Sequence, residues 1–197
     1  MTLNALIRRI KQHVCNFAAD AKASASLVAG VTFGSTIKFR NIYRIECRDA
    51  FGNLKWIEEV PNQVMTAGIN DLLTNYFKGA AYTAAFYIGL VDNASFSAYA
   101  AADTMASHAG WLESTVYSNG TRPALTLGAA AAGSISNSAS VAAFTVNASG
   151  TVRGAFVGTN NTKGGTTGTL YGAADFSAAR AVVSGDTLNV TVTLSAS

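Results

Sequence analysis

The sequence predicts a mainly β protein: an antiparallel β-sandwich of the Ig-like or jelly-roll-like kind, with one internal helix and an N-terminal amphipathic helix or arm. Apolar and polar residues alternate along residues 36–60 and again along 151–194, the pattern of half-buried strands. Clusters of Gly, Asn, Ser and Thr divide these runs into short pieces. Roughly eight to ten strands at such spacing favour a sandwich over a parallel α/β sheet.

The chain of 197 residues is long enough for one domain with an extension. We expect residues 1–35 to form an amphipathic helix followed by a tether of small residues. The β-rich domain then spans residues 36–197. Within it we expect a hairpin at 36–62, a helix at 64–78 and the sandwich strands at 85–197.

The N-terminal stretch has apolar residues at helical spacing and basic residues on the other face. Three interpretations remain open: an interfacial membrane helix, an arm that binds a partner protein, or a helix folded onto its own domain. The helix has no Trp and few cations, which disfavours the membrane interpretation. The small residues that follow, 18–34, suit a tether and favour the arm. The candidate partner-binding residues are Leu3, Leu6, Ile7, Arg8, Arg9, Ile10, Lys11, Val14 and Phe17.

The hairpin is the clearest local signal. Apolar residues from 37 to 47 alternate with charged ones, residues 49–53 supply the turn, and residues 54–60 return. We expect an exposed, ion-paired face on which basic side chains meet acidic ones across the strands. Its members are Arg44, Arg48 and Lys55 with Glu46, Glu58 and Glu59.

The helix predicted after Pro61 has an apolar face and Gly79 as its C-cap. We expect its buried side chains to be Met65, Ile69, Leu72, Leu73, Tyr76 and Phe77.

Short strands follow at 85–91, around Leu125 and Ile135, and at 141–146. A half-buried strand is expected at 151–159 and a polar turn at 160–168. Strands at 170–174 and 179–183 then lead to a final strand at 187–194. That last strand is so regular that we expect it to insert into a finished sheet.

Composition limits the function classes. Charged residues make up 13% of the chain, about half the usual share, which is typical of a β protein that works packed against other protein or that is rigid and extracellular. Residues 1–60 hold nine Lys/Arg and five Asp/Glu, and residues 61–197 hold five and six. Lys and Arg are too few for a nucleic-acid groove. Residues 8 and 9 are Arg and no h-region follows, so no secretory signal is expected. We expect synthesis in a cytoplasm.

The two cysteines, Cys15 and Cys47, are too few for a zinc site. One falls in the expected N-terminal helix and the other in an expected strand, so two reduced thiols are expected rather than a disulfide. No apolar run approaches the roughly 18 residues needed to span a membrane.

The densest cluster of functional-looking side chains falls within residues 103–122. As a ligand site it would offer a Trp platform, two carboxylates and an Arg. The alternative is that Trp111 and Tyr117 are core residues of one strand, and we favour it. A hydrolase would need His108 with a nucleophile and an orienting acid. No matching motif, metal-ligand spacing or cofactor fingerprint accompanies it, so no enzyme activity and no cofactor are expected. The candidate ligand residues are Asp103, His108, Trp111, Glu113, Tyr117 and Arg122.

Three stretches carry a resemblance. They are the hairpin and helix at 39–77, with the sequences NIY, LKW and GIND, the stretch 87–111, with YIGLVD and DTMASHAGW, and the tail KGGTTGTL at 163–170. Together they resemble small virion structural proteins of tailed bacteriophages, described as head-decoration, tail or fibre-associated proteins. The resemblance covers about residues 36–197.

The resemblance implies a protein located in the virion and assembled in the host bacterial cytoplasm. It implies binding to other virion proteins, either the major capsid protein or tail and connector proteins, and a homo-oligomer such as a trimer. The first hypothesis is a capsid decoration or cement protein anchored by its arm or hairpin. The alternative is a tail- or fibre-associated module that binds a receptor or glycan. No nucleic-acid or membrane partner is expected.

Overall fold

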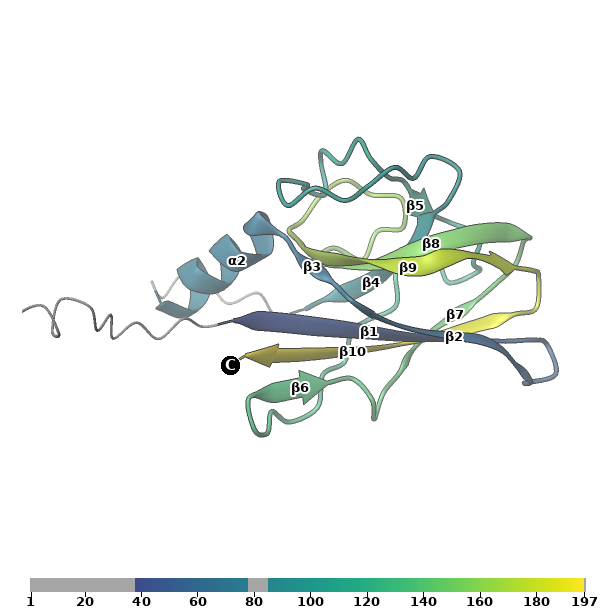
Figure 1. Cartoon of the computed structure of the whole chain (residues 1–197), viewed down its shortest axis with the longest axis horizontal. Coiled ribbons are helices and arrows are strands. Elements are labelled where there is room, and N and C mark those ends of the chain that lie inside the picture. The colour runs from purple at the N-terminus through teal and green to yellow at the C-terminus, as the bar shows by residue number, and fades with distance from the viewer. Residues whose placement is uncertain (1–37, 78–84, 197) are drawn as a thin grey trace, which may run out of the picture. The chain divides into compact units, whose positions relative to one another are not determined.

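The computed structural model describes residues 38–77 and 85–196. The chain divides into two units, Met1–Thr36 and Ile37–Ser197, and the following concerns the second unit. It is a β-sandwich of two antiparallel sheets with one short α-helix (Figure 1). The predicted mainly β class is therefore confirmed. The expected N-terminal helix and tether lie outside the described residues.

The first sheet contains the predicted hairpin and, at its centre, the C-terminal strand. Its strand order is β2-β1-β10-β6, and β7 also pairs with β10. Strand β10 pairs with β1 along its whole length, from Phe39 opposite Ala196 to Arg48 opposite Thr187. The last strand thus inserts into a finished sheet, as predicted. The strands are β1 (Phe39–Arg48), β2 (Leu54–Pro61), β6 (Ser134–Ser136), β7 (Ala142–Thr145) and β10 (Thr187–Ala196).

The second sheet has the strand order β3-β9-β8-β4-β5. Residues 170–174 and 179–183 were expected as separate strands, but β9 is one element. The β8–β9 register shifts, with Val152 opposite Arg180 and Gly154 opposite Asp175. A bulge at residues 176–179 therefore joins the two expected halves. The strands are β3 (Gln63–Val64), β4 (Tyr87–Asp92), β5 (Glu113–Ser114), β8 (Gly150–Gly158) and β9 (Leu170–Val182).

The main core lies between the sheets. Alternate residues of β1 and β10 are buried there, as the period of two in the sequence predicts. They meet side chains of the second sheet, among them Ile88, Leu90 and Val157. The members from the first sheet include Tyr43, Ile45, Cys47, Leu188, Val190 and Val192.

A second core covers the outer face of the second sheet. Strand β8 was expected to be half-buried, but from Gly154 to Gly158 it is buried on both faces. The reason is the loop 93–112, whose aromatic side chains pack on that face. This second core contains Met65, Val91, Met105, Trp111, Phe156, Leu170 and Ala173, with Phe96 and Tyr99 packed against it.

Gly154 permits this close packing. A Cβ atom at this position would lie 2.2 Å from both the Tyr99 hydroxyl and the Ala174 carbonyl oxygen. The hydroxyl of Tyr99 donates a hydrogen bond to that carbonyl. A side chain at residue 154 would therefore displace the loop from the sheet.

The predicted helix begins at Thr66 rather than at residue 64, and only its first part is α-helical. An α-helix, α2 (Thr66–Leu72), continues as a π-helical turn, η1 (Leu73–Phe77). Met65 is buried as expected, but Leu73 and Tyr76 are exposed, with 79% of Tyr76 accessible. Gly68 packs on the backbone of Tyr171. A Cβ atom on residue 68 would lie 2.8 Å from the Cα and the carbonyl oxygen of Tyr171. The π-helical turn changes the helical phase, so the prediction that Leu73 and Tyr76 are buried is wrong. Gly79 lies outside the described residues.

Candidate functional site

The 103–122 cluster divides into two groups in the structure, each with its own partners. In the first group, the indole nitrogen of Trp111 donates to Asp103 Oδ2 over 2.9 Å. The same oxygen accepts a hydrogen bond from the Ala100 amide. The carboxylate of Asp103 therefore holds the indole ring of Trp111 and the backbone of its own loop.

His108 belongs to this first group. Its ring stacks on Trp111 at a centroid distance of 3.9 Å. Its Nδ1 lies 2.9 Å from the Trp111 carbonyl oxygen. Because a carbonyl oxygen only accepts hydrogen bonds, Nδ1 carries the proton in this contact. His108 thus braces the loop, and its Nδ1 binds a carbonyl rather than the Asp103 carboxylate that a catalytic triad would use.

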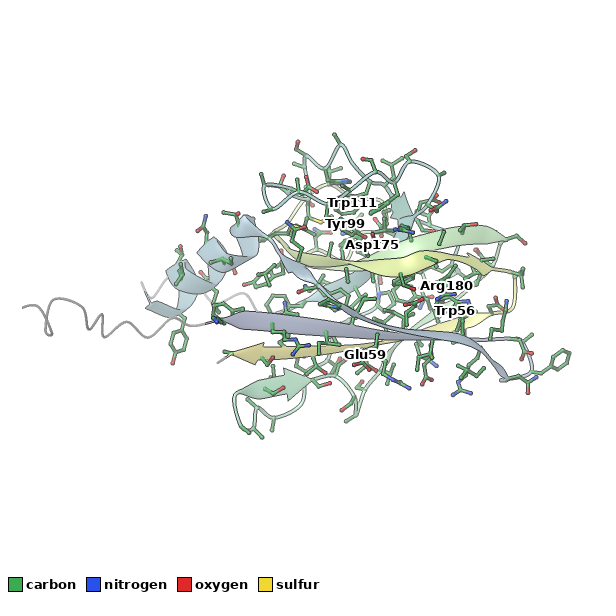
Figure 2. All side chains as sticks on the ribbon, viewed as in Figure 1. Trp56, Glu59, Tyr99, Trp111, Asp175 and Arg180 are labelled. Atoms are coloured by element: carbon green, nitrogen blue, oxygen red, sulfur yellow. The ribbon has the colours of Figure 1, made fainter. Side chains whose placement is uncertain are left out.

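Trp111 is a core residue, with only 1% of its surface accessible. Its ring packs against Tyr99 and Phe156 in the second core. Figure 2 shows Trp111 and Tyr99 close to the second sheet. The hypothesis of an exposed Trp platform for a glycan is therefore corrected: this ring has no free face. The alternative that Trp111 and Tyr117 are core residues is confirmed, but they do not share a strand. Strand β5 covers only Glu113–Ser114, and the two side chains lie in different cores.

The second group is a buried ion pair. The guanidinium of Arg122 donates from Nε to Glu113 Oε1 over 2.9 Å and from Nη2 to Glu113 Oε2 over 2.7 Å. Both side chains are almost fully buried. The hydroxyl of Tyr117 donates to the same carboxylate over 3.3 Å. Burial, followed by the charge of Glu113, raises the pKa of the Tyr117 hydroxyl well above its usual range.

This ion pair fixes the polar turn at 160–168. Arg122 also donates to the carbonyl oxygens of Asn160 and Gly165, over 2.9 and 2.8 Å. The Gly164 amide donates to Glu113 Oε2 over 2.7 Å. The Glu113–Arg122 pair therefore holds the turn against the sheet. The sequence analysis placed these two side chains in a candidate ligand site. In the structure they make hydrogen bonds with backbone groups of the protein itself.

A third polar group, between β2 and β9, was missed by the sequence analysis. Glu58 was expected on an exposed ion-paired face, but it is buried and accepts hydrogen bonds from Ser177 Oγ and Arg180 Nε, both over 2.8 Å. Burial raises the pKa of Glu58, but the hydrogen bonds from Arg180 and Ser177 outweigh it, so the pKa is lowered. Figure 2 shows Arg180 beside Trp56, with the guanidinium 5.9 Å from the ring centre.

The rest of the expected charged face is also rearranged. Arg44 and Arg48 both pair with Glu46 on their own strand. Lys55 pairs with the buried carboxylate of Asp186. Only Arg44 and Glu59 have the predicted cross-strand register. Glu58 pairs instead with Arg180, 122 residues away in the sequence. Lys55 pairs with Asp186, 131 residues away. No local sequence pattern could therefore reveal these two pairs.

An apolar cavity of about 280 Å³ opens where β1 starts and β10 ends, beside α2. The hydroxyl of Tyr43 and the amide of Asn62 contact each other at its wall. Asn62 Oδ1 is buried without a hydrogen-bond partner. The cavity was not predicted, because its walls come from seven separate stretches of chain: 39–43, 62–72, 86, 125–135, 157, 171–172 and 194–196. They include Phe39, Ile69, Leu72, Phe86, Ile135 and Leu194.

The opposite end of the same strands presents an exposed apolar tip. Phe51, in the β1–β2 turn, is 91% accessible, and Leu54 of the same hairpin and Val183 of the β9–β10 turn are also exposed. Gly185 in the β9–β10 turn lies next to Ala50. A Cβ atom on residue 185 would lie 3.2 Å from the Cβ of Ala50. The two turns therefore form one surface, the hairpin tip.

Other site classes find no support among the described residues. Residues 38–77 and 85–196 contain no group of three His, Cys, Asp or Glu side chains able to hold a metal. The same residues include no helix with the length and hydropathy required to cross a membrane. Cys47 is a free, buried thiol. The candidate arm residues from Leu3 to Phe17 lie outside the described part of the chain.

No protein-family model matches the chain, and no curated protein is similar to it.

Proposed function

We propose that the chain is a structural protein of a tailed-bacteriophage virion, a capsid decoration protein that acts by binding the assembled particle. The resemblance of residues 39–77, 87–111 and 163–170 to such proteins supports the virion class. The observation that favours a binding role over catalysis is that the polar side chains of the 103–122 cluster contact other groups of the same chain. All six candidate ligand residues of the 103–122 cluster make contacts inside the fold.

The proposed role needs a rigid domain and a surface for neighbours. The two cores and the buried Glu113–Arg122 pair supply the rigidity. Binding to an assembled lattice, and not to the free subunits, favours the assembled state by mass action. The anchors are the N-terminal arm or the hairpin of residues 36–60. Clustering of several copies multiplies weak contacts through their effective concentration.

Cosedimentation with particles that lack the protein tests the anchor. The full-length chain is expected to pellet with the particles, and a chain without residues 2–30 is expected to remain in the supernatant. The far-ultraviolet spectrum and the melting temperature of the deletion variant serve as the folding control. Undiminished binding by a folded deletion variant would contradict the role of the arm.

A tail- or fibre-associated receptor-binding module is the second candidate. It was based on an exposed Trp111 within a polar cluster. Because Trp111 is buried, the decoration role comes first. The two candidates differ in where the protein lies on the particle, which labelling of intact virions distinguishes.

A further inference from the structure

The hairpin tip presents one aromatic side chain almost completely to solvent. Phe51 is 91% accessible, the highest value among the exposed large apolar side chains of the described residues. Soluble proteins commonly expose single apolar residues. Phe51 differs because Leu54 of the same hairpin and Val183 of the adjacent β9–β10 turn are also exposed, and because its turn is held firmly.

The turn is fixed by one carboxylate. Asp49 Oδ1 accepts hydrogen bonds from the amides of Phe51 and Asn53, each over 2.9 Å. Asp49 Oδ2 accepts one from the Asn53 side chain. Gly52 has a φ of +85°, a conformation that glycine adopts readily. Arg48 donates to the Gly52 carbonyl over 3.0 Å. The backbone that carries Phe51 therefore loses little conformational entropy when the ring binds a partner.

The apolar cavity lies at the other end of the same strands. Phe39, at the start of β1, lines it, and β1 ends at Arg48, directly before the turn that carries Phe51. Figure 1 shows the β1–β2 turn at one end of the sandwich and α2, with the end of β10, at the other. The projecting ring and the cavity of one molecule therefore cannot meet each other. They can meet when a second copy stacks end to end.

The cavity is large enough and has the right chemistry. An apolar cavity of roughly 150 Å³ binds benzene, and this one measures about 280 Å³. Side chains such as Ile69, Leu72 and Leu194 supply an apolar wall for a phenyl ring.

We propose that the Phe51 ring of one copy inserts into the apolar cavity of the next copy, so that the chains associate head to tail. Such an interface uses two different surfaces, and it gives a ring if the rotation closes and a filament if it does not. The inference does not depend on the virion role. It concerns the purified protein alone.

The contact is small. A phenylalanine buries about 150–250 Å², whereas stable interfaces bury roughly 1,200–2,000 Å² in total. Association through one tip is therefore weak and depends strongly on protein concentration. Ring closure or binding to a shared lattice would strengthen it, because each further contact forms within one assembly.

Two variants of the full-length chain separate the two surfaces. Phe51→Ala removes the projecting ring and keeps the cavity. Ala130→Trp fills the cavity from its exposed edge and keeps the ring, since Ala130 lines the cavity and is exposed. Phe39→Asp, which adds a charge to the cavity wall, is a second cavity variant. The matched controls are Leu112→Ala and Ala139→Trp, both at exposed positions that do not line the cavity.

Sedimentation velocity over a range of concentrations gives the test. The wild type and the two controls are expected to show a mass that rises with concentration. Phe51→Ala and Ala130→Trp are each expected to remain at 20.3 kDa. Their equimolar mixture is expected to form a dimer that grows no further, because one variant supplies the only ring and the other the only cavity.

Three results would overturn the proposal. If the wild type stays monomeric at every concentration, copies of the chain do not associate through the cavity. Its occupant would then be another protein or a small apolar molecule. Association that is unchanged in both variants would mean that a different surface joins the copies. A mixture of the folded variants that forms no dimer would show that ring and cavity do not meet.

Discussion

Replacing Arg122 by alanine removes a buried guanidinium that donates four hydrogen bonds within the protein. The substitution leaves the Glu113 carboxylate buried without its counter-ion. It also removes the donor for the Asn160 and Gly165 carbonyl oxygens, which hold the turn at 160–168 against the sheet.

The expected cost follows from the burial of the pair. Removing one partner of a buried ion pair destabilises a protein by about 3–5 kcal/mol, because an uncompensated charge remains. The two carbonyl groups lie in a half-buried turn where water can reach them, so they add little. We expect the free energy of unfolding to fall by about 4 kcal/mol. For a chain of this size the melting temperature would fall by roughly 8–16 °C.

Urea unfolding followed by tryptophan fluorescence measures this change. Arg44→Ala is the matched control, because the Arg44 side chain is exposed and its partner Glu46 keeps a second ion pair with Arg48. Removal of such a pair costs less than about 1 kcal/mol. Arg122→Lys keeps the charge but not the two-pronged geometry, so its stability should fall between wild type and Arg122→Ala. A loss for Arg122→Ala no larger than that for Arg44→Ala would refute the assigned role of this ion pair.

Three further predictions concern single sites. The pKa of Glu58 is lowered in the folded state, so its stabilising contribution is present above the unfolded pKa of about 4.3 and is lost as the pH falls through the folded pKa. The stability gap between wild type and Glu58→Gln should therefore be large at pH 7 and small at pH 3. Burial and the nearby Asp186 carboxylate raise the pKa of Cys47 to about 12, so in a Cys15→Ser background a thiol reagent at pH 8 should react only on unfolding. Gly154→Ala should cost about 1–3 kcal/mol through steric overlap, whereas Gly120→Ala, with open space around its Cβ, should cost much less.

Each of these predictions has a contradicting result. A gap for Glu58→Gln that does not change between pH 7 and pH 3 would mean that this carboxylate does not titrate with folding. Rapid labelling of the folded protein would show that Cys47 is accessible. Equal stability of the two alanine variants would mean that Tyr99 does not pack closely on Gly154.

The sequence predicts those parts of the fold that depend on local patterns. The alternation along residues 39–48 and 187–196 identifies strands β1 and β10, because a period of two is visible within a few residues. It also predicts that the last strand inserts into a sheet. The end of α2 is mispredicted, because the π-helical turn shifts the phase that a regular helix would keep.

Features formed by distant segments could not be predicted in this way. Glu58 looks like a surface residue of a charged hairpin until Arg180, 122 residues later, packs beside it. The loop 93–112 looks exposed until its aromatic residues cover the second sheet. Gly154 was the available signal, since a glycine inside a strand often marks a close approach of another segment.

Immunogold labelling of intact phage particles with an antibody against the domain of residues 36–197 tests the proposed function most directly. A virion decoration protein predicts gold distributed over the head. Gold confined to the tail would support the receptor-binding alternative instead. Particles without gold, prepared from an infection in which the protein is produced, would contradict a role on the virion surface.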